Sequence, residues 1–270
     1  MVVNLFRLIV GFFFLSIFAW IYRGILFPVD ATPQTWLLLI ISGLIGFVFG
    51  DLCLFQAFVV IGARLSMLLM ALAPPITAFI GWITLGETLT GKSWIAMILT
   101  VAGIALVVLK REDHHEESTI SRKVKFSYPV WGILLGLGGA VGQAGGLVLS
   151  KYAMKGYSPF ASAQIRILAG IAGFAILFTI YHQWKNAFHS LSDHKAMFQL
   201  SLGAFFGPFL GVSFSLLSVQ LTTTGIASTI MALVPVLIIP ASVILFKEKA
   251  TLKEVAGAVL AVGGVALFFL

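Results

Sequence analysis

The chain has 270 residues, of which 60% are hydrophobic and only 10% are charged, and its formal net charge is +7. Soluble domains are about half apolar and about one quarter charged, so a soluble fold could not bury this much apolar surface. The composition therefore excludes an ordinary soluble protein and predicts an all-α polytopic membrane protein. The basic residues stand singly between apolar runs, which indicates contact with anionic lipid headgroups and argues against binding of nucleic acid.

Nine apolar stretches along the chain approach the length of about 20 residues that a membrane-spanning helix needs. Helices are expected because backbone polar groups inside a bilayer must be satisfied within the segment. The stretches are residues 5–22, 36–60, 65–85, 90–109, 130–149, 160–181, 198–219, 226–246 and 251–270. The connections are short except for a mixed-charge linker at 110–128, whose histidine pair is best explained as part of a solvated loop and not as a metal site.

The second stretch carries a glycine face and a carboxylate. Gly43, Gly46 and Gly50 share one helix face, which predicts close helix packing. Two further glycine faces predict the same, Gly132 with Gly136 and Gly139, and Gly203 with Gly207 and Gly211. Asp51 lies just past the middle of this stretch, where an ionisable group is costly and is a functional candidate. Its carboxyl either binds a cationic substrate, carries a coupling proton, or has a structural partner such as a buried arginine.

A polar interruption, "GETLTGKSW" at 86–94, separates the third and fourth stretches. Glu87 precedes a helix predicted to start at Thr90, whose hydroxyl can cap the free N–H groups of the first turn. A carboxylate near a helix N-terminus also complements the helix dipole. The pattern therefore predicts a structural role for Glu87, and "KEKATLKEV" at 247–255 predicts the same role for Glu248 beside Thr251.

The two halves of the chain repeat each other. A shift of 161 positions places Gly46 on Gly207, Glu87 on Glu248 and "MALAP" (70–74) on "MALVP" (231–235), without a gap from 46 to 109. A shift of 159 places Arg7 on Arg166. Such a match predicts duplication, with a four-helix repeat at 1–109, the linker at 110–128 and a five-helix repeat at 129–270. Equivalent stretches of the two copies lie five stretches apart, an odd number, which predicts that the second copy is inverted in the membrane.

These residues resemble the drug/metabolite transporter superfamily, in particular its EamA-type members. The resemblance rests on the duplicated "GETLTGKSWIAMILTVAGIALVVL" and "KEKATLKEVAGAVLAVGGVALFFL", on "MALAPP" and "MALVP", and on the arginine that opens the second helix of each repeat. It implies a ten-helix carrier of two inverted five-helix repeats that moves small organic metabolites or drugs, often outward. Helix 130–149 has no counterpart in the first half, so the chain is expected to lack the first helix of the family; a first repeat that has lost one helix is the alternative.

Polar residues present in one copy only are the better candidates for substrate chemistry, since residues shared by both copies serve the common fold. Asp51, for example, falls on Val212. The candidates for substrate binding or coupling are Asp51, Gln56, Gln143, Gln164, Ser213, Ser215, Met70 and Met231. Pro74 and Pro235 are expected near the centres of their helices, where proline kinks a helix, and are hinge or packing residues. Arg7 and Arg166 match each other and are expected to anchor helix ends, in preference to the alternative that they bind anions.

We therefore expect a secondary transporter that exports small organic metabolites or drugs by alternating access. A non-transporting or channel-like membrane protein and an inactive, N-terminally truncated carrier are the alternatives. The letters of the nucleotide motif GxxxxGK[ST] occur once, as "GETLTGKS" at 86–93, but this segment lies between two predicted helices and does not follow a strand, as a nucleotide-binding loop does. The metalloprotease motif HExxH is absent, and no enzyme activity, metal or cofactor is expected. The expected partners are a small-molecule substrate, the lipid bilayer and a coupling proton or ion, in a bacterial or archaeal cell (inner) membrane. The positive-inside rule places the linker in the cytoplasm and the family pattern places it outside, so both orientations stay open.

Overall fold

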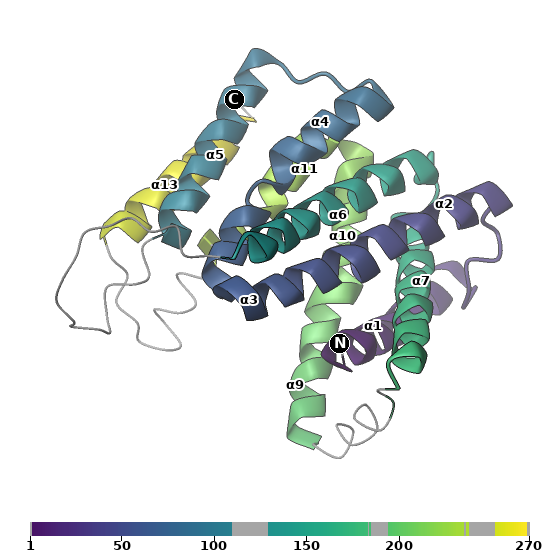
Figure 1. The fold of residues 1–270 in the computed structure, drawn as a ribbon. Helices are drawn as coiled ribbons and strands as arrows, with labels where there is room; N and C mark the ends of the chain where they lie inside the picture. Colours follow the sequence, from purple (N-terminus) through teal and green to yellow (C-terminus); the bar gives the residue numbers. More distant parts are fainter. Residues whose placement is uncertain are drawn as a thin grey trace. The chain divides into compact units, whose positions relative to one another are not determined.

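The computed structural model describes residues 2–109, 129–182, 184, 194–234, 236–237 and 252–268. The linker at 110–128, Pro235, Glu248 and Thr251 lie outside these residues. In the described part every regular element is helical (Figure 1), which confirms the predicted all-α class. The elements are α1 (Val2–Arg23), α2 (Pro33–Gly43), the π-helix η1 (Leu44–Gly50), α3 (Asp51–Met70), α4 (Ala73–Leu85), α5 (Gly91–Leu109), α6 (Val130–Met154), α7 (Pro159–Ile180), α9 (His194–Ala204), the π-helix η2 (Phe205–Gly211), α10 (Val212–Leu221), α11 (Thr224–Met231) and α13 (Leu252–Ala266).

Six helical stretches among the described residues are long and apolar enough to cross a membrane. They are Val2–Arg23, Pro33–Ala63, Leu65–Leu85, Val130–Met154, Pro159–Ile180 and Lys195–Leu221, and two shorter apolar helices are Gly91–Leu106 and Val255–Ala266. Each of the nine predicted stretches thus contains described helix. The polytopic membrane fold expected from composition is confirmed.

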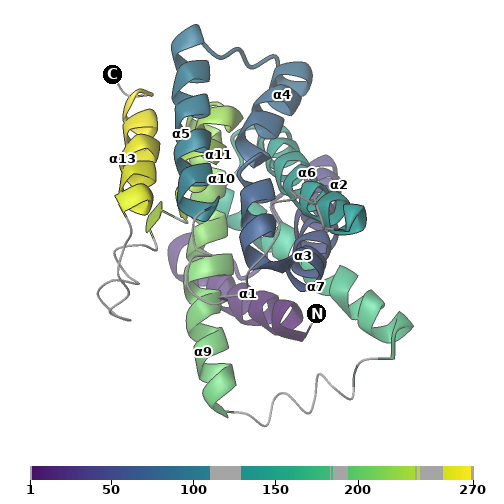
Figure 2. The ribbon, with the colours of Figure 1, turned by 60° about the vertical axis from the view of Figure 1, so that its left-hand side comes forward.

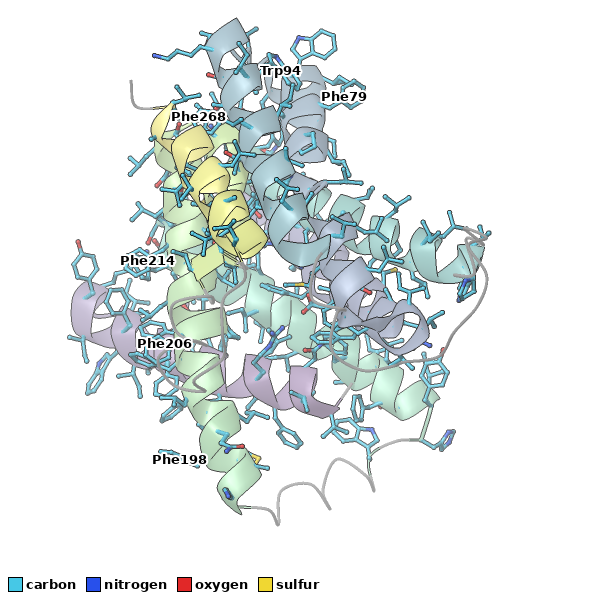
Figure 3. All side chains as sticks on the ribbon, turned by 90° about the vertical axis from the view of Figure 1, so that its left-hand side faces the viewer. Phe79, Trp94, Phe198, Phe206, Phe214 and Phe268 are labelled. Atoms are coloured by element: carbon cyan, nitrogen blue, oxygen red, sulfur yellow. The ribbon has the colours of Figure 1, made fainter. Side chains whose placement is uncertain are left out.

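Large aromatic side chains on the outside of helices support a lipid environment. Phe198, Phe206 and Phe214 lie along the stretch α9–η2–α10 (Figure 3) and are 72%, 62% and 54% exposed. Their spacing of eight residues is close to two helical turns, so the three rings project on the same side. Such a row is unfavourable in water and favourable against acyl chains.

The chain divides into two compact units, which we call unit 1 (Met1–Leu52 and Gly142–Thr224) and unit 2 (Cys53–Val141 and Gly225–Leu270). In unit 1, α7 packs against α1, α2 and α10. Small residues on α7 permit this close packing, since a Cβ at Gly170 would lie 3.0 Å from Leu8 Cδ1 and 3.2 Å from Phe47 Cβ. Helix α7 therefore forms the centre of unit 1.

The glycine face of η1 packs against α6 within unit 1. A Cβ at Gly146 would lie 3.0 Å from the Cα of Gly46, and one at Gly142 would lie 2.7 Å from the Cα of Gly50. Ser42 Oγ, one turn before this contact, donates a hydrogen bond of 2.6 Å to the Gly146 carbonyl. The close packing predicted for this face is confirmed.

The other two glycine faces differ from each other in their packing. The face on α6 packs within unit 2, where a Cβ at Gly139 would lie 3.2 Å from Leu54 Cβ. Gly203 and Gly207 meet nothing within 4 Å among the described residues, so close packing of this face stays a prediction.

In unit 2, α5 and α13 lie side by side (Figures 1 and 2). A Cβ at Gly103 would lie 2.5 Å from the backbone nitrogen of Ala261, and one at Gly264 would lie 2.7 Å from that of Thr100. The two contacts are reciprocal: Gly103 and Gly264 differ by 161 positions, and so do Thr100 and Ala261. The helices therefore meet through the same positions of each, as in a two-fold symmetric pair.

Two further helices of unit 2 end at positions that also differ by 161. Helix α3 ends at Met70 and α11 ends at Met231, and each is followed by a turn. In these turns the Leu72 N–H donates to the Leu69 carbonyl at 3.1 Å, and the Leu233 N–H donates to the Ile230 carbonyl at 3.2 Å. The same local hydrogen bond thus closes both helix ends.

The sequence predicts that Pro74 lies near the centre of a helix and kinks it. In the structure Pro74 is instead the second residue of α4. In the first turn of a helix a backbone N–H has no intrahelical acceptor, so proline there loses no hydrogen bond. The helix is interrupted before the proline, at residues 71–72, and restarts at Ala73. The proline signalled a distortion in this region, but the continuous apolar run does not show that one helix ends and another begins there.

The predicted cap of α5 is confirmed. The backbone N–H of Ser93 donates to Thr90 Oγ1 at 3.2 Å, which satisfies one of the free N–H groups of the first turn. The capping threonine, and not only the apolar pattern that follows it, therefore fixes where this helix begins.

Gly62 divides α3 with φ 81° and ψ 157°, a conformation that essentially only glycine adopts. The chain passes there from one membrane-spanning stretch to the next. We expect Gly62→Ala to lower the free energy of unfolding by about 1–3 kcal/mol through backbone strain alone, since a Cβ at Gly62 meets nothing within 4 Å. Denaturant or thermal unfolding in detergent measures this, with Gly91→Ala, another uncrowded glycine, as control. Equal effects of the two substitutions would contradict the strain.

Candidate substrate site in unit 1

Asp51 is placed by a π-helical turn. Its backbone N–H faces the carbonyls of Gly46 and Val48 at the end of η1, and the N–H of Val212 faces those of Gly207 and Phe209 at the end of η2. The two π-helices differ by 161 positions, but only the first is followed by a carboxylate. Because π-helical turns are rare and occur frequently at functional sites, their position next to Asp51 supports its candidacy.

Two side chains from other helices bind the buried carboxylate of Asp51, which is 5% exposed. Arg7 of α1 donates from Nη2 to Asp51 Oδ2 at 2.9 Å. Gln143 of α6 donates from Nε2 to Oδ1 at 3.0 Å. Each carboxylate oxygen thus has a donor, and two of the candidate residues, Asp51 and Gln143, are in direct contact.

Arg166 on α7 is the other charged residue of this region, and it is only 5% exposed. Its guanidinium carbon lies 5.1 Å from the centroid of the Phe47 ring. It interacts electrostatically with Asp51, but among the described residues Arg166 forms no ion pair, and its Nε has no hydrogen-bond partner. The prediction that Arg166 anchors a helix end is wrong, because the side chain is buried inside unit 1.

Gln164, also on α7, is buried and partly satisfied. Its Nε2 donates to Ser16 Oγ at 2.9 Å and to the Leu26 carbonyl at 2.7 Å. Its Oε1, together with the buried Oγ of Ser162 and of Ser213, has no hydrogen-bond partner among the described residues. Unit 1 therefore holds several buried polar atoms that protein groups do not satisfy, which is unusual in a folded interior.

The remaining candidates are more dispersed. Ser215 is half-buried in unit 1. In unit 2, Gln56 is exposed on α3, while Met70 and Met231 are half-buried at the ends of α3 and α11. The structure thus assembles Asp51 and Gln143 with Arg7, which sequence reasoning had set aside because it has a counterpart in the other half.

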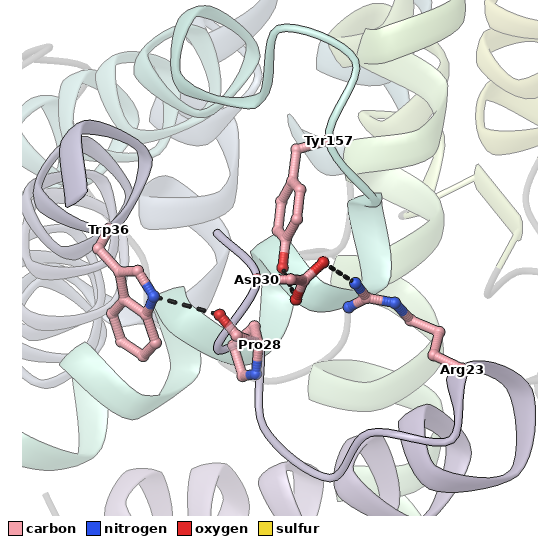
Figure 4. Close-up of polar contacts among 5 residues, drawn as sticks. All are labelled: Arg23, Pro28, Asp30, Trp36 and Tyr157. Carbon is pink, nitrogen blue, oxygen red and sulfur yellow. Dashed lines mark hydrogen bonds and ion pairs between the residues drawn. The ribbon is translucent and has the colours of Figure 1, made fainter. Parts of the chain in front are cut away.

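A second polar cluster lies in the loops at the ends of α1 and α6 (Figure 4). Asp30 accepts from Arg23 Nη2 on one oxygen and from Tyr157 Oη at 2.9 Å on the other. Trp36 Nε1 donates to the Pro28 carbonyl at 3.2 Å. These bonds hold the α1–α2 loop against the α6–α7 turn within unit 1.

The loop cluster predicts a pH dependence. Burial alone would raise the pKa of Asp30, but the hydrogen bond from Tyr157, a backbone hydrogen bond and the Arg23 charge outweigh it and lower that pKa. A lowered pKa in the folded state stabilises above the unfolded pKa of about 3.9, and this stabilisation is lost as pH falls through the folded value. We expect Tyr157→Phe to weaken this loss of stability below about pH 4, by roughly 1 kcal/mol or less at a half-exposed site.

Thermal unfolding between pH 3 and pH 7 measures this effect. Tyr152→Phe is the matched control, because Tyr152 lies near the end of α6, five residues before Tyr157, and contacts Lys155 and not Asp30. Identical pH profiles for Tyr157→Phe and the unsubstituted protein would contradict the assignment.

Comparison with known proteins decides the family. The sequence profile of the EamA-like transporter family matches residues 1–109 and 130–270. The chain belongs to the EamA-like transporter family. A protein of known crystal structure shares the fold of this EamA-like chain with a TM-score of 0.73, at 16% identity, over 98% of this chain and 86% of the other. No curated protein matches the sequence significantly.

Family membership identifies an integral multi-pass membrane protein of the drug/metabolite transporter superfamily, and thus a membrane transporter. The buried cluster of unit 1 is accordingly considered as a site for a transported solute. Among the described residues of this EamA-like protein, no group of three or more His, Cys, Asp or Glu side chains is placed to hold a metal ion.

Proposed function

We propose that this protein is a secondary transporter that exports small organic metabolites or drugs by alternating access. The two inverted repeats are residues 1–109 and 129–270, joined by the linker at 110–128. The observation that carries the proposal is the pair of helix ends at Met70 and Met231, closed by equivalent hydrogen bonds. Apolar segments interrupted at corresponding positions of two halves are typical of secondary transporters.

Each helix break supplies a hinge. A break lets the two helical parts change their angle without loss of intrahelical hydrogen bonds, which a continuous helix does not allow. Pro74 restarts the helix after the first break, and Pro235 occupies the equivalent position of the sequence after the second. We propose that both prolines keep these breaks in place during transport.

The solute site is proposed around the Asp51 carboxylate. Asp51, Gln143 and Gln164 offer a charge and two amides inside unit 1, on the α3, α6 and α7 helices. Ionisable groups inside a membrane are expensive and mark substrate or ion pathways. Asp51 is also the proposed carrier of a coupling proton or ion. The hydroxyls of Ser213 and Ser215 complete the proposed site in unit 1. In unit 2, Gln56, Met70 and Met231 stay candidates that the sequence alone suggests.

The proposal is tested by efflux from proteoliposomes. Vesicles containing the purified protein are loaded with a defined mixture of amino acids, organic acids, sugar phosphates and amines, and the released compounds are identified by mass spectrometry. Release of specific compounds above that of protein-free vesicles, reduced at least about tenfold in Asp51→Asn, is the expected result. Asp30→Asn, a carboxylate in the loop cluster, serves as control. Release that never exceeds that of protein-free vesicles would overturn the transport function.

A further inference from the structure

We propose that Arg166 binds the anionic group, a carboxylate or a phosphate, of the transported solute. The proposal rests on the proposed transport function and specifies the chemical class of the solute. Its starting point is that a buried cation on α7 has no acceptor among the described residues.

A guanidinium carries five N–H donors and no acceptor. Arg166 donates no hydrogen bond to any described residue, and its guanidinium carbon lies 5.1 Å from the centroid of the Phe47 ring. The face of an aromatic ring stabilises a buried positive charge less than a carboxylate would. An unsatisfied buried charge is strongly unfavourable, so a missing partner is expected at this position.

The acidic residues in the described part of unit 1 accept no hydrogen bond from Arg166, although the charge of Asp51 attracts it. In its described part the carboxylates are Asp30 and Asp51. Asp30 is bound by Arg23 and Tyr157 in the loop cluster, and both oxygens of Asp51 are occupied by Arg7 and Gln143. Arg7, Asp51 and Arg166 together carry +1 − 1 + 1, a net charge of +1. One negative charge from a solute would make this region neutral.

The surroundings of Arg166 are shaped for the guanidinium. A Cβ at Gly46 would lie 3.0 Å from Arg166 Nη2, so glycine leaves the room that this group occupies. Ser162 lies one helical turn before Arg166 on the same face of α7, and its buried Oγ also has no partner among the described residues. A hydroxyl beside a guanidinium is a suitable pair of donors for an oxyanion, since charge-assisted hydrogen bonds are the strong ones.

Thermal unfolding in a neutral, phosphate-free detergent tests the site. Sodium acetate and sodium phosphate are titrated, with sodium chloride at equal ionic strength as reference. We expect at least one oxyanion to raise the unfolding midpoint saturably beyond chloride, and Arg166→Gln to weaken its apparent affinity at least about tenfold. Arg23→Gln, an arginine of the loop cluster, leaves the affinity unchanged. Ser162→Ala, which removes a small group, weakens it about threefold or more.

Three results would overturn the assignment. The first is no stabilisation of the unsubstituted protein beyond that of chloride. The second is an equal response of Arg166→Gln, or of Ser162→Ala if Arg166→Gln does not fold. In the third, added phosphatidylglycerol stabilises in an Arg166-dependent way while acetate and phosphate do not, which would assign Arg166 to a lipid headgroup.

The efflux assay separates this inference from the transport function. If the released compounds are neutral or cationic and Arg166→Gln releases them as fast as the unsubstituted protein, the transporter stands and the anion site is wrong. If no compound is released but oxyanions bind through Arg166, the anion site stands and the transport function is wrong. If the released compounds carry a carboxylate or phosphate and depend on Arg166, both are supported.

Discussion

Asp51→Asn is expected to lower the free energy of unfolding by about 2–4 kcal/mol. Removing one partner of a fully buried ion pair costs about 3–5 kcal/mol because the other charge is left without compensation, and the lower range applies here since the Arg7 side chain is 30% exposed. Arg166 loses the same negative charge. Reversible unfolding of the purified protein in mixed micelles measures the change.

Two comparisons make this prediction specific to the buried cluster. Asp30→Asn removes a carboxylate from a half-exposed pair with Arg23, where the loss is expected to be about 0–1 kcal/mol. The double substitution Arg7→Gln/Asp51→Asn is expected to recover part of the stability lost in Asp51→Asn, because it removes the unpaired cation as well. Equal losses for Asp51→Asn and Asp30→Asn would mean that the Asp51 charge is not buried and paired as described.

Gly264→Ala is expected to lower the free energy of unfolding by about 2–3 kcal/mol, the upper part of the range of about 1–3 kcal/mol for adding a carbon to a well-packed contact. The new Cβ would lie 2.5 Å from Thr100 Oγ1, 2.7 Å from Thr100 N and 3.0 Å from the Ala96 carbonyl oxygen. Two of these atoms belong to the backbone of α5, so α5 and α13 have to separate. Gly103→Ala is expected to have a similar effect, since its Cβ would meet Ala261 N at 2.5 Å.

Gly263→Ala is the matched control for this contact. Gly263 precedes Gly264 on α13, and a Cβ there would meet nothing within 4 Å. Its stability is expected to stay unchanged or to rise by up to about 1 kcal/mol, because alanine is the better helix former. Similar unfolding midpoints for Gly263→Ala and Gly264→Ala would contradict the reciprocal packing of α5 and α13.

Much of the fold was accessible from the sequence because lipid as a solvent imposes a simple pattern. Long apolar runs predict the helices, and the shift of 161 positions relates features of the structure that were found independently, among them η1 with η2 and Gly103 with Gly264. Pro74 predicted a kink within one helix, but not that the helix would end at Met70 and a new one start at Ala73. An apolar run indicates burial in lipid but does not show where the hydrogen bonds within it are interrupted.

The candidate site was only partly predictable. Asp51 was found because a carboxylate within an apolar stretch is conspicuous, and Gln143 because it has no counterpart. Arg7 and Arg166 were set aside because they match each other, yet one binds Asp51 and the other has no protein acceptor in the described part. A repeat in the sequence indicates that two positions share an origin. The charged residues that surround each position depend on which helices pack against it, and this is visible only in the three-dimensional structure.

The central claim is that this chain is a carrier, and trans-stimulation tests it most directly. Proteoliposomes are preloaded with one compound identified by the efflux screen, and uptake of the same labelled compound from outside is followed. A carrier with alternating access is predicted to take up label faster from preloaded than from empty vesicles, with a rate that saturates with concentration. Uptake that is linear in concentration and indifferent to preloading would contradict the carrier and indicate a channel.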